Sequence, residues 1–201
     1  MKERGMIFNG EMVRAILDGR KTQTRRPIKW KQTRFTEIGE REDGRKWPWS
    51  EDAEHAFDFW HPCPFGSVGD RIWVRETWAR YNIDQNWHDI AYRATTPADW
   101  PEEGRWRPSI HMPRWACRIT LEITDVRVER LNAISQEDAQ AEGMELTGWR
   151  PTYSDPDSGG EVMTPYDNFA ELWLSIYGEE NWLANPWVWV IEFKRVEGGA
   201  A

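Results

Sequence analysis

Residues 187–193, WVWVIEF, form a nearly continuous apolar run late in the chain. A strand that is apolar at successive positions leaves no face for water, so it fits a central place in a closed or doubly covered sheet. The segments 70–78 and 116–130 instead alternate between apolar and polar residues, as Ile72 and Val74 illustrate on one face of the first. The sequence therefore predicts one fully covered strand and strands with a single covered face.

Short helices are expected around these strands because residues typical of helix starts and ends bound three further segments. These segments are residues 11–18, the stretch from Ser135 to Gly143 and the stretch from Thr164 to Gly178. Residues 90–93 have the pattern of an additional short strand. Helices that do not alternate regularly with strands argue against a βαβ series. The order predicts an α+β fold, a small mixed barrel with short flanking helices and long loop insertions.

The length of 201 residues favours a single domain, residues 1–201, with insertions. Segments near 30–62, 80–112 and 147–163 are rich in charge, Trp, Pro or Gly, and we expect them to be irregular insertion loops. The 15 tryptophans are the compositional anomaly. Most should pack in the core, and the others are candidates for flat aromatic walls on which bases stack.

The net charge of −8 argues against a protein that coats long nucleic acids by electrostatics alone. From Arg20 to Arg34, however, there are seven cationic side chains and no acid. This basic stretch indicates either a local site for an anion or polar ligand, or a solvated basic loop.

Two cysteines, Cys63 and Cys117, lie far apart and predict no disulfide framework, which favours a reducing compartment. No segment has the apolar length of a signal peptide or a membrane span, so we expect a cytoplasmic protein without a membrane partner. A zinc site built from these cysteines with His61 and His111 is not expected, because the spacings match no compact zinc knuckle. Neither a metal nor a cofactor is predicted.

The densest chemical signal is the segment 19–26, GRKTQTRR. A threonine hydroxyl such as that of Thr24 becomes nucleophilic when a base takes its proton, and a lysine such as Lys21 serves only if its pKa is depressed. Neighbouring arginines and burial both act in that direction. Residues three apart point to opposite faces of a flat strand, so Lys21 and Thr24 meet only if the chain turns between them. The alternative is a basic loop with two solvated threonines, Thr22 and Thr24.

Two carboxylates stand out by position. Glu76 shares a strand face with apolar residues, which indicates an ion pair, for example with the arginine cluster, or a functional role. Glu142 lies in the last turn before Gly143, where the helix dipole disfavours it slightly, and pattern alone makes it a surface residue.

His111, on a polar loop before the strand 116–130, is a candidate for substrate contact.

The motif at residues 16–25, ILDGRKTQTR, resembles the N-terminal signature of the ASCH-domain family. Downstream, residues 69–74 resemble its G-D-x-(apolar)-x-V strand, residues 141–144 its acidic helix end and residues 190–193 its closing strand. The matched pieces cover residues 6–26, 66–80, 115–145 and 164–195. The long, Trp-rich form is similar to ASCH proteins of phages and prophages.

The resemblance implies a PUA-like β-barrel that handles RNA or modified nucleosides. The best-matched characterised members are amidohydrolases that remove the acetyl group from N(4)-acetylcytidine, with a lysine, a threonine and a glutamate as the catalytic set. These roles fall on Lys21, Thr24 and Glu142. In the implied reaction Lys21 accepts the Thr24 proton, Thr24 attacks the amide carbonyl, and Glu142 carries a proton to the leaving amine.

Arg25 and Arg26 are candidates to stabilise the oxyanion, and Trp78 to stack on the base. The full set of candidate substrate-binding residues is Arg25, Arg26, Arg75, Glu76, Trp78 and His111. Other ASCH members are RNA binders or nucleases, so the alternatives are a non-catalytic RNA or modified-base binding module and an ASCH-type ribonuclease.

Overall fold

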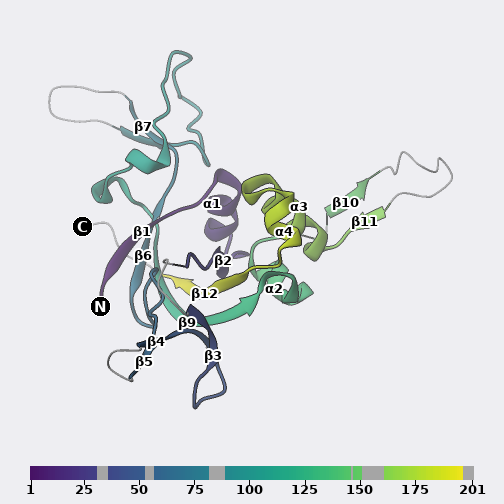
Figure 1. The fold of residues 1–201 in the computed structure, drawn as a ribbon. Helices are drawn as coiled ribbons and strands as arrows, with labels where there is room; N and C mark the ends of the chain where they lie inside the picture. Colours follow the sequence, from purple (N-terminus) through teal and green to yellow (C-terminus); the bar gives the residue numbers. More distant parts are fainter. Residues whose placement is uncertain (31–35, 53–56, 82–88, 146, 151–160, 197–201) are drawn as a thin grey trace. The chain divides into compact units, whose positions relative to one another are not determined.

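The computed structural model of the chain describes residues 1–30, 36–52, 57–81, 89–145, 147–150 and 161–196. Figure 1 shows their helices and strands. These residues group into two compact units. Unit 1 contains Met1–Gly19, Pro64–Thr124 and Phe193–Ala201, and unit 2 contains Arg20–Cys63 and Asp125–Glu192.

The elements of unit 1 are short except for β9, which runs on into unit 2. They are β1 (Glu3–Ile7), α1 (Gly10–Leu17), β6 (Arg71–Arg75), β7 (Trp78–Tyr81), β8 (Asp89–Tyr92), the 3-10 turns η1 (Ser109–His111) and η2 (Arg114–Ala116), and β9 (Thr120–Arg130).

Unit 2 holds more helix. Its elements are β2 (Gln23–Pro27), β3 (Thr36–Glu40), β4 (Lys46–Asp52), β5 (Phe57–Trp60), η3 (Leu131–Ala133), α2 (Gln136–Ala141), β10 (Thr147–Arg150), β11 (Glu161–Met163), α3 (Pro165–Tyr177), α4 (Glu179–Leu183) and β12 (Trp187–Arg195).

The principal sheet has the order β1-β6-β9-β12-β2. In unit 1, β1 lies parallel to β6, and β6 pairs antiparallel with the start of β9. In unit 2, β12 pairs antiparallel with β2, so that Ile191 lies opposite Thr24. The strand β12 has hydrogen-bonded neighbours on both sides, as its apolar run predicts. The α+β fold class is confirmed, whereas this strand order has two ends among the described residues and no closed barrel is shown.

The core of unit 2 lies between its helices and β12. Phe169 and Trp173 of α3 pack with Val188 and Val190 of β12 and with Ala139 of α2. The start of α3 follows from its sequence, because the Thr164 side chain accepts from the Asp167 N–H and Asp167 returns the contact, as in a capping box. Ile176 follows Phe169 and Trp173 at helical spacing but is 47% exposed, so the buried stripe of α3 is narrower than the apolar pattern of its sequence.

The expectation of an irregular loop over residues 30–62 is wrong in its described part. Strands β3, β4 and β5 form an antiparallel three-stranded sheet there. The pattern was obscured because Pro48 and Trp47 are both buried and Pro is rare inside strands. Similarly, β7 pairs with β8 inside 80–112, and β10 pairs with β11 inside 147–163, while residues 151–160 lie outside the described part.

None of the helices in the described part of the chain has the length and apolar character that crossing a lipid bilayer requires.

Candidate functional site

The candidate site of unit 2 begins at the end of α2. Ser135 caps this helix by accepting a hydrogen bond from the Asp138 N–H, and Glu142 is the C-terminal cap residue. Gly143 follows with φ of 93°, a conformation that glycine adopts without steric cost, and its N–H donates to the Gln140 carbonyl at 2.8 Å. This ending turns the chain directly after Glu142 and fixes the direction of its side chain.

Lys21 lies against this helix end. The two residues Lys21 and Glu142 form an antiparallel β-bridge, and the adjoining Thr22 N–H donates to the Ala141 carbonyl at 2.8 Å. The Lys21 Nζ is 2.6 Å from Glu142 Oε2 and 2.9 Å from the Glu142 carbonyl oxygen. The Lys21 side chain is 0% exposed and the Glu142 side chain 3% exposed. The amine and the carboxylate therefore form a buried ion pair, held from both backbone and side chain.

Arg25 joins the ion pair to further acids. Its two terminal nitrogens reach three carboxylates: Glu142 Oε1 at 3.4 Å, Glu129 Oε2 at 3.1 Å and Asp138 Oδ2 at 2.7 Å. The Arg25 side chain is 1% exposed, and its Nε has no hydrogen-bond partner among the described residues. Arg25 therefore shares one buried positive charge between the site carboxylate and two acids at the rim.

Arg127 closes the network on its more exposed side. Its guanidinium contacts Glu129 at 2.6 Å, Asp138 at 3.1 Å and Glu192, while Gln23 donates to the Asp138 carbonyl at 2.7 Å. Burial lowers the pKa of Arg127, but these acids outweigh it and the net shift is upward. Burial raises the pKa of Asp138, yet the hydrogen bond and charge of Arg25 and the charge of Arg127 leave it below its ordinary value. Both shifts favour the charged forms of Arg127 and Asp138 near neutral pH.

The surroundings of Lys21 shift its pKa in the direction that favours proton transfer. Burial lowers its pKa, the Glu142 carboxylate raises it, and the guanidinium charges of Arg26 and Arg25 lower it again; the net shift is downward. A lysine with a depressed pKa is closer to the neutral form that accepts a proton.

Thr24 lies in β2 and is buried, at 1% exposure. The side chains on either side of it, Gln23 and Arg25, both reach Asp138, so they share a face and alternation directs Thr24 to the opposite one. No turn separates Lys21 from Thr24, since β2 begins at Gln23. Among the described contacts, no hydrogen bond joins the Thr24 hydroxyl to Lys21 or Glu142. The structure brings Lys21, Glu142 and Arg25 together, but it places Thr24 on the opposite face of β2 from Arg25, so the predicted meeting of Lys21 and Thr24 is not seen.

The second group of predicted residues lies in unit 1. Glu76, 1% exposed, is ion-paired, but its partner is Arg118 and not the basic stretch 20–34. The pairing is bidentate, with Arg118 Nε at 2.8 Å from Oε1 and Nη2 at 2.9 Å from Oε2. Arg118 also lies over the Tyr92 ring at 4.0 Å, and burial raises the pKa of that tyrosine to about 12.

The other predicted contacts of unit 1 are dispersed. Arg75 donates to the Ile110 carbonyl and lies 5.3 Å from the Trp73 ring. Trp78 is buried at 2% exposure, with its ring edge-on to Trp115, so no face is open for a base. His111 is exposed at the end of η1. Arg26 of unit 2 is half-buried beside Lys21.

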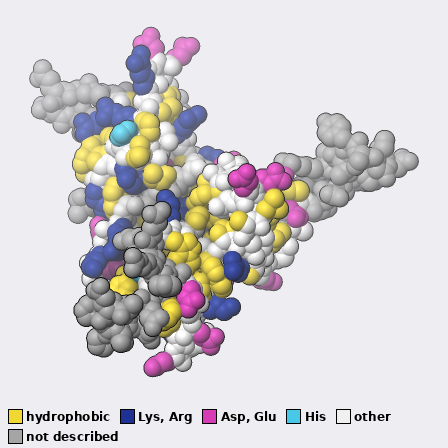
Figure 2. Space-filling view, in the orientation of Figure 1, with side chains coloured by type: hydrophobic (Ala, Val, Ile, Leu, Met, Phe, Trp, Pro, Cys, Tyr) yellow, Lys and Arg dark blue, Asp and Glu magenta, His cyan; other side chains and the backbone are white. Residues whose placement is uncertain are grey.

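Figure 2 shows cationic side chains among hydrophobic ones around β7 in unit 1. The exposed Trp115 there lies under the Arg80 guanidinium at 4.4 Å. An exposed indole with a cation over it is a surface of the kind that stacks on nucleic-acid bases.

Sequence reasoning missed Asp138, Glu129, Arg127 and Arg118 as members of these networks. Asp138 lies three positions after the cap residue Ser135, where an acidic residue is common at a helix start, so its place in the sequence indicated no further role. Arg127 and Glu129, two apart on β9, share a strand face, which alternation alone could have indicated.

Within the described residues, no three or more His, Cys, Asp or Glu side chains are grouped so as to hold a metal ion. Comparison of the chain with protein-family models, with curated proteins and with solved structures gives no match in any of the three.

Proposed function

We propose that this chain is an ASCH-type protein with a PUA-like core, and that it hydrolyses the acyl amide of N(4)-acetylcytidine or a related N(4)-acylated cytosine nucleoside. The observation that carries the proposal is the buried contact of 2.6 Å between Lys21 Nζ and Glu142 Oε2. Two residues 121 positions apart, assigned to one catalytic set by resemblance to the ASCH family, share one buried contact.

The pair has the properties of a proton-transfer device. Neutral Lys21 takes the Thr24 hydroxyl proton while the threonine oxygen bonds to the acyl carbon. The bond between that carbon and N4 then breaks, and Glu142 passes the proton from Lys21 to N4, which leaves as the amine of cytidine. Water hydrolyses the threonine ester, releases the carboxylic acid and restores the hydroxyl.

The ligand-free geometry sets a requirement on this reaction. Because Lys21 is bonded to Glu142 and Thr24 lies on the opposite face of β2 from Arg25, the proposed reaction requires substrate binding to loosen the bridge and to rotate this part of β2, so that the Thr24 hydroxyl comes within reach of the amine. Asp138 and Glu129, at 26% exposure each, mark the side on which the network meets solvent.

The test is direct. Purified protein is incubated with N(4)-acetylcytidine, and the release of cytidine is followed by chromatography. The proposal predicts time-dependent release proportional to enzyme concentration. Absence of cytidine under conditions where the protein is folded would contradict it.

A second candidate function, binding of RNA or a modified base without catalysis, is favoured by the exposed Trp115 beneath Arg80. In that case the Lys21–Glu142 pair serves stability alone. A labelled single-stranded RNA should then bind in a salt-dependent manner, and Trp115→Ala should weaken binding while cytidine release from N(4)-acetylcytidine is absent.

A further inference from the structure

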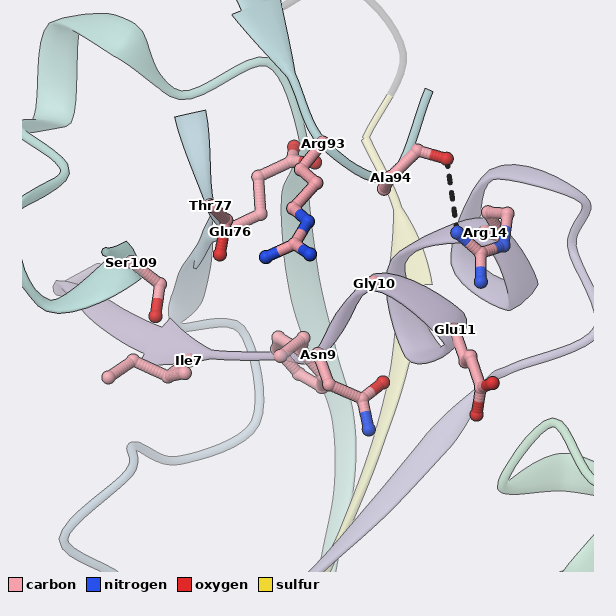
Figure 3. A pocket seen from close by; sticks show the side chains of 11 residues that line it. Ile7, Asn9, Gly10, Glu11, Arg14, Glu76, Thr77, Arg93, Ala94 and Ser109 are labelled. Carbon is pink, nitrogen blue, oxygen red and sulfur yellow. Dashed lines mark hydrogen bonds between the residues drawn. The ribbon is translucent and has the colours of Figure 1, made fainter. Parts of the chain in front are cut away.

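Unit 1 contains a cavity of about 500 Å³ that the sequence did not indicate. It is bordered by the end of β1 and the first turn of α1, the residues between β6 and β7, the residues after β8, and η1 (Figure 3). Its lining includes Asn9, Gly10, Thr77, Arg93 and Ser109. This volume is within the range of small-molecule sites and exceeds what a single inorganic ion fills.

Arg93 is the cationic group that the cavity leaves available. Figure 3 shows its guanidinium projecting into the space between Thr77 and the first residues of α1. Its backbone is fixed by a 2.9 Å hydrogen bond from its N–H to the Thr77 carbonyl. Arg93 forms no ion pair with any other residue that the structure describes. Arg93 is exposed, and a guanidinium without a carboxylate partner presents a planar fork of donors to an anion.

The other charged side chains that line the cavity are bonded to neighbouring groups or point away from Arg93. The Glu76 carboxylate is neutralised by its bidentate pair with Arg118. The Arg14 guanidinium donates to the Ala94 carbonyl at 3.2 Å, the bond drawn in Figure 3. The Glu11 carboxylate points away from Arg93 in the same view. The charge that faces the cavity is therefore that of Arg93.

Neutral donors complete the cavity. Ser109 and Thr77 contribute hydroxyl groups, and Gly10 opens the first turn of α1. Asn9 caps that helix by accepting from the Met12 N–H at 2.8 Å, so the preceding amides of the turn are not used by the cap. Ile7 and Ala94 add apolar wall. A cation, hydroxyl donors and apolar wall together suit an anion that carries an organic group.

We propose that this cavity binds a phosphate monoester of a small organic molecule, with the phosphate on Arg93 and Ser109. A tetrahedral phosphate offers oxygens for both the guanidinium fork and hydroxyl donors at once, which a flat carboxylate does less well. The proposal does not depend on the proposed hydrolase function, because its residues are separate from Lys21, Thr24 and Glu142.

The test uses the full chain and three probes: cytidine 5′-monophosphate, cytidine and inorganic phosphate, titrated calorimetrically. Cytidine monophosphate should bind, inorganic phosphate should compete with it, and cytidine should bind at least about tenfold more weakly. Arg93→Gln should weaken the nucleotide by about tenfold or more, and Arg93→Lys should restore part of the affinity.

Arg105→Gln is the matched control, since Arg105 is exposed in unit 1 and does not line the cavity. It should change the affinity by less than about twofold. Equal effects of Arg93→Gln and Arg105→Gln would overturn the proposal, as would cytidine binding as tightly as its monophosphate, or no binding of the monophosphate at all. Circular dichroism of each variant establishes that it is folded.

Discussion

Glu142 Oε2 accepts a hydrogen bond from Lys21 Nζ at 2.6 Å, while Glu142 Oε1 faces the Arg25 guanidinium at 3.4 Å. One carboxylate thus stands between two buried cations. Removing either cation leaves Glu142 with a single partner, and removing Glu142 leaves two buried positive charges with reduced compensation. The carboxylate is accordingly the electrostatic centre of the network in unit 2.

The energetic coupling of this pair is the first prediction. Lys21→Met or Glu142→Gln alone should lower the free energy of unfolding by about 3–5 kcal/mol, because each leaves a buried charge without its partner. The double variant should lose clearly less than the sum of the two, since both members of the pair are then absent and Arg25 keeps Glu129 and Asp138 as partners. Urea unfolding followed by Trp fluorescence measures all three.

The neighbouring residue supplies the control for that cycle. Arg20 pairs with Glu145 at 2.9 Å, with side chains 39% and 54% exposed, so Arg20→Met should cost no more than about 1 kcal/mol. Additive losses in the Lys21 and Glu142 cycle would show that the two side chains do not interact as described.

The fall in the free energy of unfolding at acid pH should depend on Asp138. Its pKa is below the ordinary value in the folded state, so it stabilises the protein at a pH above the unfolded pKa of about 3.9, and this contribution is lost as the pH falls through the folded pKa. Asp138→Asn should therefore flatten the fall in unfolding free energy between about pH 5 and about pH 2. Asp125→Asn, at the exposed ion pair with Arg45, is the comparison. An unchanged slope in Asp138→Asn would contradict the network.

The pH dependence of turnover tests the state of Lys21. Since burial lowers its pKa, the rising limb of kcat/KM should lie below the ordinary lysine value of about 10.4. Arg26→Gln removes a charge that lowers this pKa, so the limb should move to higher pH. A limb that stays in place in Arg26→Gln would argue against Lys21 as the base.

Local signals in the sequence predicted local structure well. The caps at Ser135 and Thr164 and the end of α3 at Gly178 depend on a few adjacent residues and were found correctly. The central place of β12 followed from its unbroken apolar run. By contrast, the pairing of β3, β4 and β5 depends on cross-strand contacts of Trp and Pro residues, which no period along one segment reveals.

The candidate site was predictable only in part, for a related reason. Lys21 and Glu142 meet across 121 positions, and Glu142 had the pattern of a surface residue until the resemblance to ASCH proteins gave it a role. Glu76 was also predictable only in part. Its place on an apolar strand face predicted an ion pair, but it did not predict that Arg118 is the partner. Side-chain partners across strands depend on register, which single-segment patterns do not determine. The catalytic roles of Lys21, Thr24 and Glu142 remain predictions.

The most direct measurement compares two isosteric substitutions two residues apart, Thr24→Val and Thr22→Val, in the release of cytidine from N(4)-acetylcytidine. Thr24 is buried in β2 and is the proposed nucleophile, whereas Thr22 is exposed. Neither substitution touches the Lys21–Glu142 pair, so both proteins should fold. The account predicts that Thr24→Val abolishes turnover while Thr22→Val retains it. Equal turnover of the two variants would contradict the account.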